Sequence, residues 1–495
     1  MDKIVLEFGE FTPDQPDAKS AVTMVDNVVP NQLGYTSLAS EAQISDAINA
    51  RARGAYAARD SSGTVYNYVG NETKLYSLSS NTHTDVTRSN GAYTTGSTEF
   101  WEFQKFGDDL YATNFTDLFQ KITLGGTNFA DVTAAPKARH ASLINNFMVL
   151  GNLDESGTLT PNKVKWSAIN DPTTWAITTA NQAGEQVLYS TAKNGGGFIQ
   201  KVVGGEEGLI LQEYSIWRMQ YVGGQELFLF DEIAPGIGTP ARNSVIDLGE
   251  QVFFLGQDGF YKVVNSASIE PIGESKVDRW FFDDVDDENI DRVIGAADNA
   301  KRIVAWIYPD GNSPDGTPNK MILYNWAIGK WSTASVDAHW IYAGLGESTT
   351  TEDLDSQFAT VDSASTQLVD AREFLGGTLQ LAVYDTNHKK ASFSGSARAA
   401  TIDTVEGQFG PGRFHITGVR PLIEGTGCTI TGAVGYRDNL NNESVTFTSD
   451  ASPESDTNIC PQRIDARYAK ARIKTSGEFD FAVGAEIFGV ASGVR

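Results

Sequence analysis

The sequence is poor in the residues that build disulfide frameworks and metal centres. Only two cysteines, Cys428 and Cys460, occur among 495 residues, and their spacing does not match that of metal ligands. The five histidines are isolated from one another along the chain. We therefore expect both thiols to be free, and the alternative is a disulfide between neighbouring strands. We expect the histidines to be ordinary packing or surface residues. We expect no bound metal or cofactor.

Sequence motifs typical of several enzyme classes are also absent. The chain contains no GxSxG for a nucleophile elbow, no GxxxxGK[ST] or GxGxxG phosphate loop, and no S-x-D-x-G-x-x-W box of sialidases. With 63 acidic residues, a pair of carboxylates at glycosidase spacing would arise by chance and carries no information. We expect a protein that is not an enzyme, and the alternative is a propeller that binds or depolymerises surface carbohydrate.

Long apolar runs are absent too. No window approaches the roughly 18 uninterrupted apolar residues that a membrane helix requires. The first ten residues, MDKIVLEFGE, lack the charged and apolar regions of a signal peptide. The sequence therefore predicts neither a membrane span nor a secretion signal.

Positive charge is scarce, since 38 basic residues face 63 acidic ones and the net charge is −25. The basic residues are scattered, whereas tight nucleic-acid binders carry a basic stripe that displaces counterions from phosphate. One interpretation is that this acidity keeps a large oligomer soluble. It also suits an inner wall along which DNA passes without being held.

One acidic run stands out within the segment ESKVDRWFFDDVDDENIDRV. Its members are Asp283, Asp284, Asp286, Asp287 and Glu288. A solvated loop is one interpretation, and a cation site or an acidic rim facing a lumen is the other. A second acidic segment, with Asp310, Asn312 and Asp315, lacks the full spacing of a calcium loop and is predicted to be a polar turn.

What the sequence does contain is a recurring pair of short strands between residues 55 and 395. An alternating apolar strand runs into a turn rich in Gly, Asn or Asp, and a second strand follows that usually opens with an aromatic residue. The first strands of the copies recur about every fifty residues, a spacing typical of propeller blades. They begin near Val65, Leu110, Phe147, Leu209, Val252, Ile303 and Leu379.

Isolated hairpins are marginally stable in water, so repeated hairpins must stack on one another. The pattern predicts an all-β fold with a β-propeller of six or seven blades over residues 55–395. A stacked array of β-sandwiches is the alternative. Within this region Val277, Trp280 and Phe281 have the spacing of one helical face and predict a short helix.

The two ends of the chain differ from this central region. Residues 1–54 are predicted to form an extended N-terminal arm, of which residues 1–30 are the candidate for adding a strand to a neighbouring subunit. Ser40, Gln43 and Gly54 predict a short helix over SEAQISDAINARARG. After the small-residue stretch GSARAA, residues 396–495 alternate in the manner of a separate antiparallel β-sandwich.

Several phrases resemble those of one known family. They are NVVPNQLGY, FQKFGDDLYATN, KVKWSAINDPTTW with its W-S-x-x-x-D-P-x-x-W spacing, EEGLILQEYSIWRMQYVGG, LGEQVFFLGQDGFYKV, VRPLIEG, VGYRD and CPQRIDARYAKARIKTSG. In this order they are similar to the nozzle proteins, also called tail tubular or packaged-DNA stabilisation proteins, of short-tailed phages. The chain lacks the long inserted domain of the family's larger members.

The resemblance implies a structural virion protein without catalytic residues, assembled in the host cytoplasm. It implies a homo-oligomeric ring, expected to be a hexamer, that forms the distal tail nozzle below portal and adaptor, continues the DNA-ejection conduit and helps retain packaged DNA. Its implied partners are the tail adaptor protein, a tail fibre or tailspike, and in some phages a plug or needle. DNA would pass through the lumen transiently, without specific binding.

Overall fold

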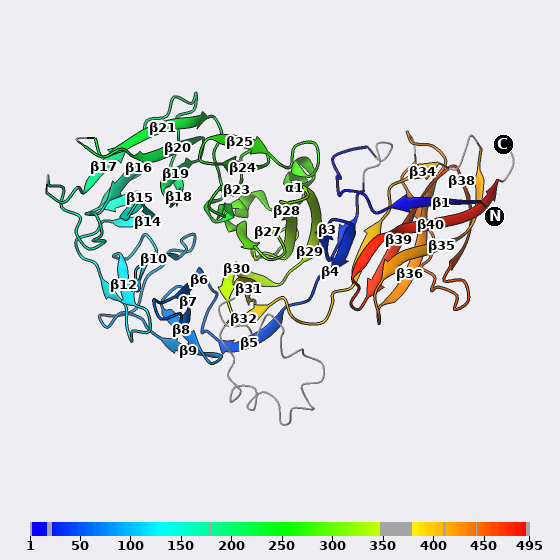
Figure 1. Cartoon of the computed structure of the whole chain (residues 1–495), viewed down its shortest axis with the longest axis horizontal. Helices are drawn as coiled ribbons and strands as arrows, with labels where there is room; N and C mark the ends of the chain where they lie inside the picture. Colours follow the sequence, from blue (N-terminus) through cyan, green and yellow to red (C-terminus); the bar gives the residue numbers. More distant parts are fainter. Residues whose placement is uncertain are drawn as a thin grey trace.

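A computed structural model describes residues 2–16, 22–178, 180–224, 226–346, 379–408, 412–441 and 443–491. Strands dominate these residues, and a single α-helix, α1 (Asp278–Asp284), occurs among them. A disk of radiating sheets lies beside a smaller two-layered body along the long axis of the molecule (Figure 1). No helix in the described ranges is long and apolar enough to cross a membrane.

The disk is a β-propeller built of seven four-stranded antiparallel units, which we number as blades 1 to 7 in chain order. Blade 1 comprises β6 (Ala55–Arg59), β7 (Val65–Gly70), β8 (Leu75–Ser79) and β9 (Thr82–Asp85). Blade 2 comprises β10 (Glu102–Phe106), β11 (Asp109–Thr113), β12 (Gln120–Thr123) and β13 (Ala130–Asp131). Blade 3 comprises β14 (Lys137–Ile144), β15 (Phe147–Glu155), β16 (Thr158–Trp166) and β17 (Gly184–Val187). The predicted propeller is therefore present.

Blades 4 to 7 continue the same order around the disk. Blade 4 comprises β18 (Ile199–Val203), β19 (Glu207–Gln212), β20 (Ser215–Tyr221) and β21 (Phe228–Pro235), and blade 5 comprises β22 (Ile246–Asp247), β23 (Gln251–Leu255), β24 (Phe260–Val264) and β25 (Ser268–Pro271). Blade 6 comprises β26 (Ile294–Asp298), β27 (Ile303–Tyr308), β28 (Lys320–Asn325) and β29 (Lys330–Ser335). Blade 7 comprises β30 (Ala338–Leu345), β31 (Leu379–Asp385) and β32 (Lys389–Ser392) together with β5 (Ala42–Ala47).

The hairpins recognised in the sequence are the second and third strands of the blades. Val65 opens β7 and Ile303 opens β27, and each is followed by the aromatic-bearing third strand of its blade. These strands carry regular alternation or continuous apolar runs because they lie in the middle of a blade. Some first and fourth strands are much shorter, and β13 and β22 have only two residues each.

Blade 7 is completed by a strand from the opposite end of the chain. β5 pairs with β32 in antiparallel register, with Ala42 opposite Ser392. Gln43 donates a hydrogen bond to Asp385 Oδ2 at 2.6 Å, and the Lys390 amide donates to Ser45 Oγ at 2.9 Å. The helix predicted over residues 40–54 was wrong, because pairing along this open blade edge outweighs the helix propensity of the segment.

The smaller body is an antiparallel β-sandwich. One sheet contains β1 (Asp2–Glu7), β3 (Val28–Asn31), β4 (Gly34–Ser37), β40 (Phe481–Ala491), β35 (Phe414–Glu424) and β38 (Cys460–Ala466). The other contains β2 (Val25–Asp26), β33 (Ala400–Asp403), β39 (Tyr468–Ser476), β36 (Thr429–Arg437), β37 (Thr446–Phe447) and β34 (Gly407–Gln408). Because β2 pairs with β33 and also with β29 of blade 6, this second sheet is continuous with the propeller.

The N-terminal segment is extended, as expected, but its strands pair within their own chain. β1 lies along β40, and β3 and β4 form a hairpin in the same sheet. These ladders lie within one chain, and strand addition by residues 1–30 to a neighbouring subunit stays a prediction. Leu6, Phe8 and Phe11 are buried, so the segment gains more apolar burial inside the chain than as a free arm.

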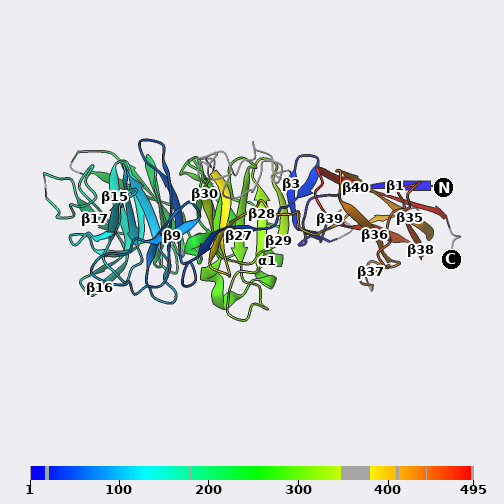
Figure 2. The same ribbon diagram turned by 90° about the horizontal axis from the view of Figure 1, so that it is seen from below.

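One hydrophobic cluster joins the sandwich to blades 5 and 6. It includes Phe11 and Val28 from the N-terminal segment, Phe253 and Trp306 from the blades, and Ile473 from the sandwich. Its other fully buried members include Val22, Val25, Tyr35, Leu255, Phe260, Val277, Phe281, Val304, Tyr308, Ile322, Trp331, Ile402, Ile416 and Val419. Propeller and sandwich therefore share a core, and Figure 2 shows them side by side in one elongated body.

The predicted short helix is confirmed as α1. Its side chain Phe281 is buried, whereas Trp280 packs edge-on against Phe11 with ring centroids 5.4 Å apart. Asp14 accepts hydrogen bonds from the amides of Arg279 and Trp280 at 2.9 and 2.8 Å. A carboxylate at this end satisfies amides that have no partner within the helix.

Closure of blade 7 by β5 can be tested with a disulfide. Residues directly opposite each other in an antiparallel ladder lie close enough for an S–S bond, so Ala42→Cys with Ser392→Cys should crosslink under oxidising conditions. The bond would close a very long loop and should stabilise the protein by about 2–5 kcal/mol. Peptide mapping identifies the linked pair, and chemical unfolding measures the gain.

The reduced double variant and the single Ala42→Cys variant are the matched controls, since both retain the substitution without the crosslink. A linkage of either new cysteine to Cys428 in place of its partner, or no linkage at all, would contradict the placement of β5.

Candidate functional site

The first strands of the blades form a ring around the propeller axis, and a cavity of about 290 Å³ lies inside it. Six of the seven blades, all except blade 6, contribute to its wall. The lining residues are Ala55, Tyr56, Phe100, Trp101, Glu102, Phe103, Gln104, Arg139, His140, Ala141, Ser142, Lys201, Val202, Val203, Gly204, Arg242, Asn243, Val245, Asp247 and Trp340. We call this space the axial cavity.

Residues 95–101, which lead into β10 (Glu102–Phe106), cross the propeller axis near the beginning of the first strands of the blades. Arg53 of blade 1 donates to the carbonyl oxygens of Thr95, at 2.9 Å, and of Gly96. Glu99 pairs with Arg139 of blade 3 at 2.8 Å and with Arg242 of blade 5 at 3.0 Å. Because blades 1, 3 and 5 are not neighbours, a segment bound by all three must lie over the centre.

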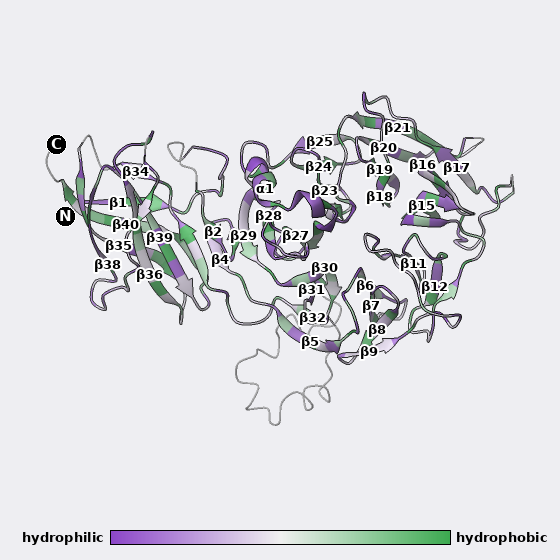
Figure 3. Ribbon diagram, turned by 180° about the vertical axis from the view of Figure 1, so that it is seen from behind, coloured by the Kyte–Doolittle hydropathy of each residue, from purple (hydrophilic) through white to green (hydrophobic). Residues whose placement is uncertain are grey.

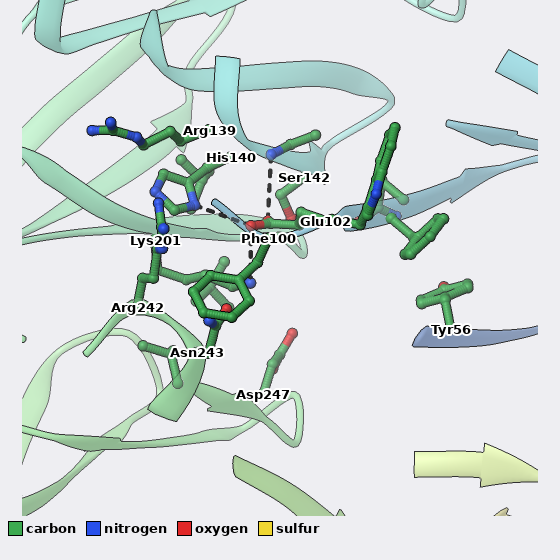
Figure 4. A pocket seen from close by; sticks show the side chains of 18 of the residues that line it. Tyr56, Phe100, Glu102, Arg139, His140, Ser142, Lys201, Arg242, Asn243 and Asp247 are labelled. Atoms are coloured by element: carbon green, nitrogen blue, oxygen red, sulfur yellow. Dashed lines mark hydrogen bonds and ion pairs between the residues drawn. The ribbon is translucent and has the colours of Figure 1, made fainter. Parts of the chain in front are cut away.

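Glu102 is the hub of the charged side of the axial cavity (Figure 4). Its carboxylate lies 3.0 Å from His140 Nδ1 and 3.2 Å from Lys201 Nζ, and it accepts a bond from the Ala141 amide at 3.3 Å. Burial alone would raise the pKa of this carboxyl. The Lys201 ammonium and His140 outweigh burial and lower the pKa to about 2, so Glu102 is ionised.

The histidine of this cluster is almost completely buried. His140 has 1% of its side chain exposed, and burial lowers its pKa, with Glu102 acting in the opposite direction. The neutral ring therefore donates from Nδ1 to Glu102 near neutral pH. Its Nε2 has no hydrogen-bond partner among the described residues, and the same is true of Asn243 Nδ2.

Aromatic side chains form the other side of the axial cavity. Tyr56 and Phe103 stack with centroids 6.2 Å apart, and Phe100 lies 5.6 Å from Trp340. The guanidinium of Arg242 covers Phe100 at 5.1 Å and joins the two sides. Figure 4 shows Arg139, His140, Lys201 and Arg242 grouped on one side of Glu102, with Tyr56 on the other.

Asp247, the last residue of β22, lines the axial cavity. Its Oδ1 accepts a bond from the Gly249 amide at 2.7 Å. The concave surroundings raise the pKa of this carboxyl by desolvation, against that bond and the charge of Lys201. A second hollow of about 420 Å³, between blades 4 and 5, shares Val203, Gly204 and Asp247 with the axial cavity.

The acidic run predicted as a lumen rim lies on and after α1, away from the axial cavity. Asp284 accepts bonds from Tyr308 Oη at 2.9 Å and Lys320 Nζ at 2.7 Å, so it is a packing contact. Asp286 caps the following 3₁₀ segment (Asp287–Arg292) by accepting from the Glu288 amide. These two carboxylates have structural roles in the connection between blades 5 and 6.

The other three members of the run, Asp283, Asp287 and Glu288, are exposed. The helix that carries Asp283 is largely hydrophilic in colour in Figure 3 and stands out from one face of the disk in Figure 2. None of the five acidic residues lines the axial cavity.

A second acidic group beside α1 was missed in the sequence. Asp278 is surrounded by Asp14, Asp258 and Glu274, and desolvation together with these like charges raises its pKa to about 7. The Phe260 amide, which donates to Asp278 Oδ1 at 3.0 Å, opposes the shift. Because the acidic neighbours come from three separate segments, no local pattern predicts this group.

The remaining polar segments that the sequence singled out are structural. Asp310 accepts bonds from the Asn312 amide and from Asn319, and lies 3.2 Å from Lys320. In the W-S-x-x-x-D-P-x-x-W phrase, Asp171 accepts from Thr173 and Thr174. Both are polar turns, as predicted for the Asp310 segment.

Cys428 and Cys460 are free, and burial raises the pKa of the Cys460 thiol to about 11. Across the described residues, no group of three or more His, Cys, Asp or Glu side chains is arranged to hold a metal ion.

Comparison with known proteins gives fold-level likeness only. No family model and no curated protein sequence matches the chain. Among solved structures, the extracellular domain of a hybrid two-component system from B. thetaiotaomicron is 11% identical, with a TM-score of 0.40, over 79% of this chain and 42% of that one. A second structure of that extracellular domain, described there as part of a one-component system, is 10% identical, with a TM-score of 0.40, over 82% and 47%.

The propeller protein BamB from Moraxella catarrhalis is 8% identical, with a TM-score of 0.36, over 79% of this chain and 95% of that one. The chain spans less than half of the two B. thetaiotaomicron domains. Likeness at these TM-scores supports no statement about activity or partners.

The Glu102 hub should carry a large part of the stability of the ring. Glu102→Gln leaves the Lys201 ammonium in the wall without its counter-charge and should lower the free energy of unfolding by roughly 3–5 kcal/mol at pH 7. In the parent protein the folded-state pKa of about 2 lies below the ordinary 4.5, so this stabilisation is full above about pH 5. It is lost as the pH falls toward 2.

Glu270→Gln is the matched control, because Glu270 pairs with Lys262 at 2.8 Å but is half exposed and should cost less than about 1 kcal/mol. Urea unfolding at several pH values measures both variants. Equal effects of the two substitutions, or an unchanged acid dependence in Glu102→Gln, would rule out the hub.

The acidic group around Asp278 should have the opposite pH dependence. A folded-state pKa of about 7 lies above the ordinary 3.8, so the fold becomes more stable as the pH falls from about 7 toward 4. Asp278→Asn keeps the acceptor for the Phe260 amide and removes the charge. It should raise the melting temperature at pH 8 and have little effect at pH 5, and a gain of the same size at both pH values would refute the assignment.

Proposed function

We propose that the chain is a structural virion protein of a short-tailed phage and forms the distal tail nozzle as a homo-oligomeric, six-membered ring. One observation carries the proposal. Phrases that resemble this family follow one another in the family's order, from residues 27–35 near the start to residues 460–477 near the end. The ring would continue the DNA-ejection conduit below portal and adaptor and help retain packaged DNA.

The stiffness of the subunit supports a mechanical role. Because the sheet of the sandwich continues through β2 into blade 6, and because both parts share one core, the two cannot hinge without breaking strand pairing and packing. Close-packed interiors of this kind deform little under load. A conduit that guides a pressurised polymer needs a wall with this property.

The charge distribution supports passage of DNA without capture. Inside the propeller, Arg139, Arg242 and Lys201 are paired with carboxylates. The excess of acidic residues that gives a net charge of −25 therefore lies largely elsewhere, and includes the exposed Asp283, Asp287 and Glu288. An acidic wall repels phosphate and offers no counterion release on contact.

The conduit of this proposal lies between subunits and not along the propeller axis. The axial cavity has a volume of only about 290 Å³, and residues 95–101 cross it on one face. A DNA duplex cannot enter such a space. The subunit would instead contribute one outer surface to a larger lumen, into which DNA passes transiently without specific binding.

The partners in this proposal are the tail adaptor protein, a tail fibre or tailspike, and a plug or needle. The protein would reside in the tail of the virion after assembly in the host cytoplasm. Its role is mechanical and electrostatic, and no catalytic step is assigned to it.

The proposal predicts a ring of defined stoichiometry. The purified protein at high concentration, or after mixing with purified adaptor rings, should form particles of about six subunits in mass photometry and closed rings in negative-stain images. These rings should retain less DNA on a filter than a basic control protein at physiological salt. A protein that stays monomeric alone and with the adaptor would contradict the proposal.

A further inference from the structure

The fourth, outermost strands of the blades differ in length and in how their free edges are covered. Those of blades 1, 2, 3 and 5 have two to four residues each, and so short an edge offers little template for another strand. β29 of blade 6 is covered by β2, and β5 of blade 7 lies against blade 1, where the Asp46 amide donates to the Asn81 carbonyl oxygen at 3.0 Å. β21 of blade 4 has eight residues, and no strand in the described part of the chain pairs with its outer side.

The outer side of β21 presents backbone groups that face away from β20. The Val222 amide donates to the Leu227 carbonyl oxygen at 3.0 Å, and this bond fixes which pairs of the β20–β21 ladder are hydrogen-bonded. Leu229 and Asp231 therefore bond to β20. The residues whose N–H and C=O groups point outward are Phe228, Phe230 and Glu232. Within the described ranges, none of these groups bonds to the backbone of another blade or loop.

A hollow of about 710 Å³ lies beside this edge, between the outer strands of blades 3 and 4. Trp166, Phe228 and Phe230 form an apolar part of its wall, with the Trp166 ring centroid 5.2 Å from that of Phe228 and 6.1 Å from that of Phe230. Figure 1 shows β17 and β21 in the part of the disk away from the sandwich, so the sandwich does not cover them. Side chains of a strand placed opposite Phe228 and Phe230 would point into this hollow.

The edge is acidic, and two of its carboxylates have no basic partner. Glu232 accepts hydrogen bonds from Thr191 Oγ1 at 2.6 Å and from the Thr191 amide at 3.0 Å, and Glu226 lines the hollow in an exposed position. Neither forms an ion pair with another described residue, whereas Asp231 is paired with Arg218 at 2.9 Å. Two copies of β21 paired with each other would bring no cation to Glu232, because β21 has no basic residue. The charge of this edge therefore favours a basic strand over a second copy of the chain.

From these features we infer that the outer edge of β21 binds an extended segment of a partner polypeptide as a fifth strand of blade 4. The segment carries a basic residue opposite Glu232 and apolar residues opposite Phe230 and Phe228, whose side chains enter the hollow. Main-chain hydrogen bonds supply affinity in this mode of binding, and alternate side chains supply specificity. The chain already contains a related arrangement, since β2 extends blade 6 beyond β29. The inference concerns one blade of one subunit and stands apart from the nozzle proposal.

The test uses the full chain and a fluorescein-labelled peptide, KTVTFTK, as the probe. In antiparallel pairing its first lysine lies opposite Glu232, its valine opposite Phe230, its phenylalanine opposite Phe228 and its last lysine opposite Glu226. Fluorescence anisotropy should show saturable binding, and hydrogen exchange should slow in β21 and not in β25.

Two altered peptides separate backbone pairing from charge attraction. The peptide with N-methyl valine keeps every side chain and charge but cannot donate from valine to β21, so it should bind at least tenfold more weakly. The peptide ETVTFTE keeps the backbone and reverses the charge, and it should also bind at least tenfold more weakly.

On the protein side, Glu232→Gln should weaken binding of KTVTFTK at least threefold with an unchanged melting temperature, because the amide keeps an acceptor oxygen for Thr191. Glu270→Gln removes a carboxylate from β25, the outermost strand of blade 5, and is the matched control that should bind as the parent does. No saturable binding, equal binding of the N-methyl peptide, or unchanged binding by Glu232→Gln would overturn the inference. An oligomer that KTVTFTK dissociates in sedimentation would assign β21 to a contact between copies of the chain and would also overturn it.

Discussion

Closure of the propeller is the constraint on which the rest of the structure depends. β5 comes from the N-terminal side of the ring and completes blade 7 beside β30, β31 and β32, so this blade joins the two ends of the ring. The residues just before β5 form β1 to β4, which belong to the sandwich or join it to blade 6. The same N-terminal segment thus closes the ring and attaches the second body, so neither can form its full core without the other.

The charged residues at the propeller axis are paired with one another, whereas the excess of acidic residues lies largely away from the axis. At the axis, ion pairs connect blades that are not neighbours, through Glu102 to Lys201 and through Glu99 to Arg242. These pairs are shielded from solvent, so removal of one partner is costly. Away from the axis, desolvation together with the carboxylates of Asp14, Asp258 and Glu274 raises the pKa of Asp278. A stiff subunit with an acidic surface suits a wall past which DNA slides.

The sequence predicted the class of fold because its strongest pattern comes from the middle of each blade. The second and third strands alternate or are wholly apolar, and their turns need Asn, Asp or Gly, so local physics defines them. β13 and β22 are too short to have a pattern. β5 has the composition of a helix and becomes a strand only through its pairing with β32, more than 340 residues away.

The axial site could not be predicted for a related reason. Its members come from six blades, and residues such as Glu102, His140 and Lys201 are each unremarkable in their own segments. The acidic run after residue 282 was visible in the sequence because its members are adjacent. The structure assigns two of them, Asp284 and Asp286, to local packing and capping. The acidic run could be found because its residues are neighbours in the sequence. The residues of the axial site come together only when the ring of blades is closed.

The most direct measurement of the central claim is a cryo-EM reconstruction of the short-tailed phage virion in which we propose that this protein occurs. The account predicts that six copies of the propeller and its fused sandwich fit the density at the distal end of the tail. Their surfaces around the lumen should be more acidic than those facing outward. Density of this shape at a peripheral fibre or spike, or its absence from the tail, would contradict the account.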